Sequence, residues 1–235
     1  MASIIDAVQE AINDDMSMLK YFVFAIPVFF SIYLYNSGNY SGFWIIASMT
    51  FILLFGFLIE CTANVRNGKN HILPSFNIFI MFWAGIKGII AIGPSIAINI
   101  WLAAFICSRF TIADPNVDGV IKGLVYAVFI TLILTSYLLY ANNFKIADAY
   151  NLKVITDASV DVLIAILFFI PQLIIANAII TGSITYVFWL ILGIPNPICT
   201  FFWCMVLIFN LAIIANYLAQ VDYEVMGVKE NQDKI

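Results

Sequence analysis

The fold is decided by long apolar stretches, of which residues 43–59, FWIIASMTFILLFGFLI, are typical. Residues 22–35 and 162–180 have the same character, because none of the three stretches contains a charged side chain or alternates regularly between apolar and polar residues. A transmembrane β-strand would show that alternation. Backbone N–H and C=O groups find no water inside a bilayer, so unbroken apolar stretches cross it as helices with internal hydrogen bonds. The sequence therefore predicts an all-α fold, a polytopic bundle of transmembrane helices.

The composition argues against other classes of protein. Hydrophobic residues make up 63% of the 235 residues and charged residues 10%, against about 45–50% and about 25% in soluble domains. The formal net charge is −4 and there is no basic stripe, so we expect no nucleic-acid partner. The four cysteines lie in or beside apolar stretches, without the spacing of a zinc or redox motif. We therefore expect no metal site and no cofactor, and a single integral membrane domain over residues 1–235.

A spanning helix needs about twenty apolar residues, and runs of that kind predict six spans. Two of the runs are too long for one straight helix. The predicted spans are residues 19–35, 42–62, 77–107, 120–141, 157–180 and 186–218.

Glycine and proline within these runs predict helix breaks. Gly93 and Pro94 fall in the third run, and Pro195 and Pro197 in the last, so we expect both runs to be helix-break-helix units. Pro171 interrupts the fifth run in the same way. If the last break is a loop inside the membrane, the residues before it form a re-entrant half-helix.

The distribution of lysine and arginine predicts the orientation. Seven of these residues lie in the first, third and fifth polar segments and the C-terminus, against two in the alternate loops. Because cytoplasmic loops carry the excess of positive charge, we expect both termini in the cytoplasm, residues 219–235 as a cytoplasmic tail, and the cell (inner, cytoplasmic) membrane as the location.

Residues 1–19 predict an amphipathic helix along the cytoplasmic interface. Ile5, Ile12 and Met16 share one helical stripe, and Asp6 and Glu10 lie opposite. Helices that sense anionic lipid usually carry lysine and arginine on the polar face. Since this polar face is acidic, we expect the helix to pack against its own bundle.

Several short motifs in the first hundred residues form a pattern. They are Asp14-Asp15 before Leu19-Lys20, Gly56-Phe57-Leu58, Asn64-Val65-Arg66-Asn67-Gly68, Leu73-Pro74-Ser75-Phe76, Gly85 and Lys87. The pattern resembles the prokaryotic multi-pass membrane proteins of the domain-of-unknown-function family numbered four thousand and thirteen. Ser75-Phe76 stands where that family commonly has Glu-Trp, and the acidic cluster after its proline is missing here. The resemblance implies a multi-pass membrane fold and supplies no activity.

Lys87 is a charged residue inside an apolar run. A lysine at the centre of a spanning helix costs about 2.5–3.5 kcal/mol, so it needs a partner or must extend to the interface. Asp157, Asp161 and Glu60 are the candidate partners, and we predict the pair Lys87 with Asp161. Such a pair serves either as a structural salt bridge or as a coupling or substrate-binding pair in a transporter. For Asp157, capping of a helix N-terminus is the commoner explanation.

Function is predicted from what the sequence lacks and from these charges. No nucleophile elbow, zinc-protease motif, P-loop or dinucleotide fingerprint occurs in the sequence, so we expect no enzyme. The leading hypothesis is a non-catalytic membrane subunit or scaffold of a larger assembly, which acts in the lipid bilayer through protein partners or self-association. The alternative is a small-solute transporter or channel that uses Lys87 and Asp161.

Overall fold

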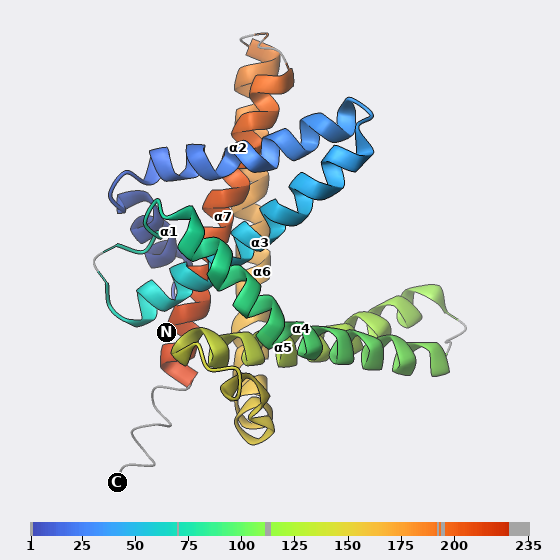
Figure 1. Cartoon of the computed structure of the whole chain (residues 1–235). Helices are drawn as coiled ribbons and strands as arrows, with labels where there is room; N and C mark the ends of the chain where they lie inside the picture. Colours follow the sequence, from blue (N-terminus) through green and yellow to red (C-terminus); the bar gives the residue numbers. More distant parts are fainter. Residues whose placement is uncertain (1, 70, 111–113, 192, 194–195, 226–235) are drawn as a thin grey trace. The chain divides into compact units, whose positions relative to one another are not determined.

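The computed structural model describes residues 2–69, 71–110, 114–191, 193 and 196–225, and this part of the chain contains seven α-helices and no strand. The all-α prediction is confirmed. The α-helices, drawn in Figure 1, are α1 (Ile4–Asn13), α2 (Ser17–Asn36), α3 (Tyr40–Arg66), α4 (Ile78–Arg109), α5 (Pro115–Asn143), α6 (Leu152–Thr185) and α7 (Asn196–Val225). A 3-10 turn, η1 (Asp148–Tyr150), precedes α6, and a π-helical segment, η2 (Tyr186–Ile191), follows it.

Six apolar helical segments in the described part of the chain are long enough to cross a membrane, and the chain is a multi-pass membrane protein. They lie in α2, α3, α4, α5, α6 with η2, and α7. The six predicted spans therefore correspond to six helical segments. The choice of membrane and the side on which the termini lie stay predictions.

The boundary between the last two spans differs from the prediction. Residues 186–191 continue directly from α6 as the π-helical segment η2, so they end the fifth apolar segment instead of beginning the last one. Gly193 follows with φ +59, a backbone conformation that suits glycine. α7 then begins at Asn196, with Pro197 in its first turn, where proline costs no helical hydrogen bond. Pro195, the other expected break, lies outside the described residues, as does the predicted tail beyond Val225.

Prolines inside the spans do not interrupt the helices. α4 runs continuously through Gly93 and Pro94, and α6 runs through Pro171. The expected break at Pro94 is therefore not found. A proline removes one backbone hydrogen bond, but breaking the helix would expose several more polar groups where no water replaces their bonds. The continuous helix is the less costly solution.

Backbone contacts divide the chain into two compact units, each described here by itself. The first unit extends to Ile86 and includes residues 168–220, and the second unit comprises residues 87–167 with the end of α7 from Val221. In the second unit, Ser95 Oγ donates to Ser136 Oγ at 3.3 Å, and the Tyr150 hydroxyl donates to the Ala91 carbonyl at 2.7 Å. These bonds tie α4 to α5 and to η1.

The first unit is organised around the close approach of α3 and α4. A Cβ atom on Gly56 would lie 1.8 Å from the Met81 carbonyl oxygen, and one on Gly85 would lie 2.0 Å from the Ile52 carbonyl oxygen. The two backbones therefore touch where only glycine fits, as in other tightly packed membrane helices. The buried rings of Phe24 and Phe57 pack edge to face at 5.1 Å and join α2 to this core.

The amphipathic α1 packs on its own unit with its small residues inward. Ala7 and Ala11 are fully buried, whereas Ile5 is 65% and Ile12 56% exposed. The expected packing of α1 against the chain is found, but the apolar stripe faces outward because alanines allow the closest approach.

Candidate functional site

The turn between α1 and α2 directs a carboxylate into the first unit. Met16 adopts the left-handed conformation, with φ 55, and α2 begins directly after it. Ser17 Oγ donates to the Ile12 carbonyl at 2.9 Å, and the Tyr21 hydroxyl donates to the Ala11 carbonyl at 2.7 Å. These bonds satisfy carbonyls at the end of α1 that have no partner within the helix. The turn thus holds Asp14 in a buried position.

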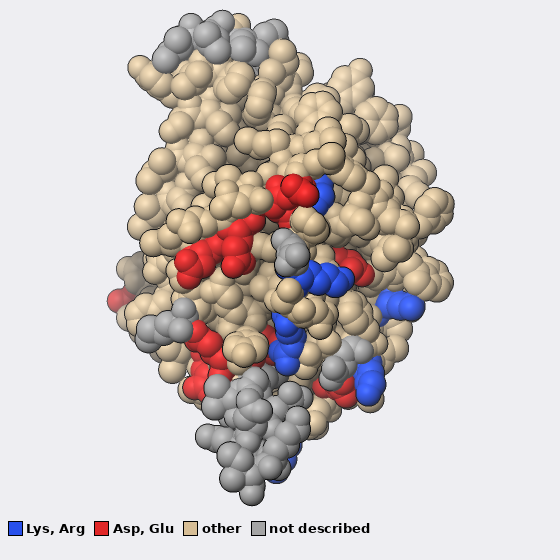
Figure 2. Space-filling model, turned by 90° about the vertical axis from the view of Figure 1, so that its left-hand side faces the viewer, with Lys and Arg blue, Asp and Glu red and all other residues tan. Residues whose placement is uncertain are grey.

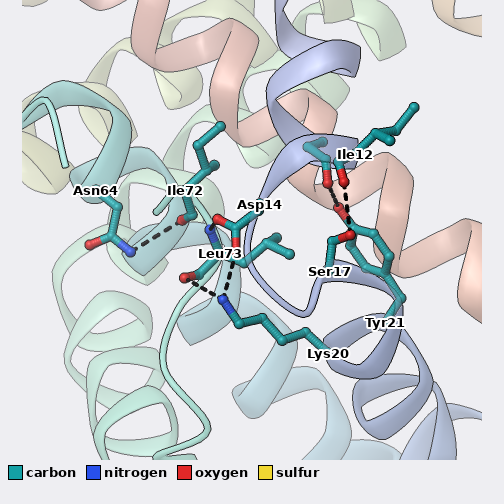
Figure 3. A network of polar contacts seen from close by, with 9 residues as sticks. Ile12, Asp14, Ser17, Lys20, Tyr21, Asn64, Ile72 and Leu73 are labelled. Atoms are coloured by element: carbon teal, nitrogen blue, oxygen red, sulfur yellow. Dashed lines mark hydrogen bonds and ion pairs between the residues drawn. The ribbon is translucent and has the colours of Figure 1, made fainter. Parts of the chain in front are cut away.

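Asp14 joins α2 to the segment between α3 and α4, as Figure 3 shows. Lys20 Nζ donates to Asp14 Oδ1 at 2.7 Å and to the Leu73 carbonyl at 3.4 Å, while the Leu73 N–H donates to Asp14 Oδ2 at 2.8 Å. Both carboxylate oxygens are therefore occupied, one by a charge and one by the backbone. We call Asp14, Lys20 and Leu73 the Asp14 cluster.

The end of α3 is held beside this cluster by Asn64. Gly68 has φ +60 and lets the chain turn after α3, and the Lys69 N–H then donates to the Asn64 carbonyl at 3.0 Å. The Asn64 side chain donates to the Ile72 carbonyl at 3.1 Å and accepts from Lys69 Nζ at 2.9 Å. Asn64 thereby fixes the segment that delivers Leu73 to Asp14.

A cavity of about 450 Å³ lies beside the Asp14 cluster, and we call it the loop cavity. Side chains of both charges line it, together with apolar and neutral polar ones. The lining residues are Asp15, Met16, Lys20, Glu60, Asn64, Lys69, His71, Leu73, Pro74, Ser75 and Phe76. No group of three or more His, Cys, Asp or Glu side chains in the described part of the chain could hold a metal ion.

A second polar network attaches α1 to α7. Asn216, which is fully buried, donates to Glu10 Oε2 at 2.7 Å and accepts from the Gln220 amide at 3.1 Å. Gln220 Oε1 in turn accepts from the Ser3 N–H at 2.8 Å. The bonds of Glu10 and Ser3 each span more than two hundred residues of sequence, so they fix the N-terminal helix against the last one.

A third link joins α6 and α7 within the apolar part of the first unit. Asn177 Nδ2 donates to Asn210 Oδ1 at 3.0 Å, and the Asn210 amide donates back to Asn177 Oδ1. Asn177 also donates to the Leu173 carbonyl at 2.9 Å. The two amides of neighbouring helices therefore satisfy each other.

The four charged residues that the sequence analysis singled out are divided between the two units. Glu60 is half-buried and lines the loop cavity, whereas Lys87, Asp157 and Asp161 are exposed residues of the second unit. The pairing of Lys87 with Asp161 stays a prediction.

Sequence reasoning missed Asp14 and Lys20 as site residues. Both belong to the pattern that carries the family resemblance, and so do Asn64 and Leu73. The available signal was an aspartate six residues before a lysine that opens an apolar run. A separation of six residues does not place two side chains on one helical face, so the spacing alone does not indicate an ion pair.

The comparisons with known proteins add no relative. No protein-family model, curated protein or solved structure matches the chain. The resemblance carried by Asp14, Lys20, Asn64 and Leu73 therefore stays a prediction.

Proposed function

We propose that the protein is a non-catalytic membrane subunit or scaffold that acts through a protein partner or a second copy of itself. One observation carries the proposal. The buried polar side chains of the first unit bind one another and the backbone across distant segments, as Asp14, Lys20 and Asn216 do. Such groups hold a surface in one shape, which is what a scaffold needs.

This use of polar groups favours a scaffold over a path for solutes. A group that handles a passing solute must release its protein partner, and a buried polar group without a partner costs about 1–3 kcal/mol or more. Both oxygens of Asp14 and both ends of the Asn216 amide are already engaged. Release would have to separate α1 from α7 and the Leu73 segment from α2.

The outer side of α1 is the surface that we assign to the partner. It presents exposed Asp6 and the exposed apolar Ile5 and Ile12, whereas the Glu10 carboxylate accepts from Asn216 of α7. Figure 2 shows a row of acidic side chains with basic side chains beside it, and further charged side chains elsewhere on the same face. A fixed helix with charged and apolar side chains can be recognised by a partner without a change of fold.

Site-specific photo-crosslinking in native membranes tests the proposal. A photoreactive residue at position 6, on α1, is compared with one at Ile174, an exposed apolar position within α6. We expect a protein adduct of one defined mass from position 6 and only lipid adducts from position 174. An adduct of twice the protein's own mass identifies self-association. The absence of any protein adduct at position 6 contradicts the proposal.

A small-solute transporter or channel that uses Lys87 and Asp161 is the second candidate. The observation that favours the binding of a solute is the loop cavity, which has charges of both signs, including Glu60, although neither Lys87 nor Asp161 lines it. Flux through the parent protein in sealed vesicles, abolished by Lys87→Gln with an unchanged unfolding temperature, would support transport. No flux through the parent would leave the scaffold as the better proposal.

A further inference from the structure

One wall of the loop cavity contains a carboxylate, that of Glu60, which accepts no hydrogen bond from the described residues. Glu60 is half-buried, and within the described residues it forms no hydrogen bond or ion pair. It lies one helical turn before Asn64 on α3, so both side chains face the cavity. A partly desolvated carboxylate is stabilised by a cation or a hydrogen-bond donor. This wall is therefore complementary to an ammonium group, and Asp15 adds a second carboxylate.

Two lysines in the same lining can bind the anionic part of a ligand. Lys20 donates to Asp14 and to the Leu73 carbonyl, and Lys69 donates to Asn64. An ammonium group has three donors, so each lysine keeps at least one donor for a ligand. His71 and the Ser75 hydroxyl also line the cavity and can donate. Several donors from separate residues suit an anion with several oxygens, such as phosphate.

The charges in the lining of the cavity act on each other without direct contact. Lys69 interacts electrostatically with Glu60, yet the two do not form an ion pair. The cavity volume of about 450 Å³ falls in the usual range of about 300–1,000 Å³ for small-molecule sites. A simple cation would be repelled by the lysines and a simple anion by the carboxylates. A molecule that carries both charges satisfies both walls.

We propose that the loop cavity binds a phosphoethanolamine group, with its primary ammonium on Glu60 and Asp15 and its phosphate on Lys69 and Lys20. The group is shared by the headgroup of phosphatidylethanolamine and by free O-phosphoethanolamine. A trimethylated ammonium, as in phosphatidylcholine, has no N–H to donate to Glu60, so the cavity discriminates against it. The proposal is independent of the scaffold function, which needs no ligand.

Binding is measured on the full chain, purified in detergent and freed of lipid. Native mass spectrometry compares retention of phosphatidylethanolamine, phosphatidylcholine and phosphatidylglycerol, and calorimetry measures O-phosphoethanolamine alone. We expect phosphatidylethanolamine to bind about tenfold more tightly than phosphatidylcholine, as the loss of a charged hydrogen bond predicts. Binding of phosphatidylethanolamine without free O-phosphoethanolamine identifies a lipid as the source, and binding of the free compound identifies a soluble ligand. Equal retention of all three lipids with no binding of the free compound overturns the proposal.

Two variants separate the two walls. Glu60→Gln keeps the size of the side chain and removes its charge, and Lys69→Gln, in an exposed position, does the same for the anion wall. Each should weaken phosphoethanolamine binding about tenfold, and only Lys69→Gln should weaken phosphatidylglycerol. Lys153→Gln, at an exposed lysine outside the cavity lining, is the matched control for Lys69→Gln and should leave binding unchanged. If both cavity variants bind like the parent protein, the assignment is wrong.

Discussion

Two ion pairs of almost equal length differ in how far solvent reaches them. Lys20 and Asp14 lie 2.7 Å apart, with side chains 8% and 0% exposed, whereas Lys122 and Asp118 lie 2.6 Å apart, with side chains 32% and 17% exposed. The first pair joins separate segments of the first unit, and the second lies one turn apart on α5 in the second unit. Distance alone therefore says little about the energy of an ion pair.

The difference lies in what each pair would leave behind if it were broken. Removal of Asp14 leaves the Lys20 ammonium and the Leu73 N–H buried without their acceptor. Removal of either partner of the α5 pair leaves a side chain that water can reach. A buried pair thus acts as a constraint on the fold, because most of its effect is the penalty for breaking it.

The largest expected effect follows from substitution of Asp14 by alanine. Breaking a buried pair by removal of one partner costs about 3–5 kcal/mol, and here a backbone bond to Leu73 is lost as well. We expect Asp14→Ala to lower the free energy of unfolding in detergent by about that amount. Asp15→Ala, at the exposed neighbouring carboxylate, is the control and should be close to neutral. Equal stability of the two variants would remove the contrast between the ion pairs.

The next effect concerns the close contact of α3 and α4 in the same unit. Gly56→Ala places a methyl group where the Met81 carbonyl now lies, 1.8 Å from the new Cβ. Overpacking of this kind costs about 1–3 kcal/mol. Gly123→Ala on α5, where a Cβ meets no atom within 4 Å, should be neutral or stabilising, since alanine favours helix by up to about 1 kcal/mol. Thermal unfolding of both variants in the same detergent measures the difference, and a Gly56→Ala protein as stable as the parent contradicts the packing.

The spans could be predicted from the sequence, because about twenty apolar residues in a row have few alternatives in a bilayer. The ends of the spans were harder to predict. Pro94 was expected to break α4, yet the surrounding backbone bonds keep the helix intact. Residues 186–191 were assigned to the sixth span, although they end the fifth, because an apolar run does not show where one helix stops. The end of this helix is marked instead by Gly193, with φ +59.

The candidate site could be predicted only in part from the sequence, for a different reason. Glu60 was singled out as a charge at the end of a span, and it does line the loop cavity. The Asp14 cluster depends on the left-handed turn at Met16 and on a backbone group fifty-nine residues away in sequence. Neither follows from periodicity or composition, since Met16 is an unusual residue for that conformation.

The amide pair Asn177 and Asn210 provides an uncharged counterpart to the Asp14 cluster. Interhelical hydrogen bonds in membranes average about 0.6 kcal/mol, with a maximum near 1.7 kcal/mol. We expect a coupling energy in that range from a double-mutant cycle with Asn177→Leu and Asn210→Leu, well below the effect of Asp14→Ala. A coupling as large as that of the buried ion pair would show that charge is not what distinguishes the two links.

The smallest expected effect belongs to the partly exposed pair Lys122 and Asp118, and its dependence on salt sharpens the comparison further. A pair one turn apart on a helix contributes about 0.3–0.5 kcal/mol, so Lys122→Ala should lower the free energy of unfolding by no more than that. Because ions screen charges that water reaches, the loss should shrink as salt is raised. The penalty of Asp14→Ala should stay nearly constant over the same range, since Asp14 and Lys20 are shielded from solvent. Unfolding of the parent and both variants at low and high salt measures the two slopes, and a parallel decline would mean that solvent reaches Asp14 as readily as it reaches Asp118.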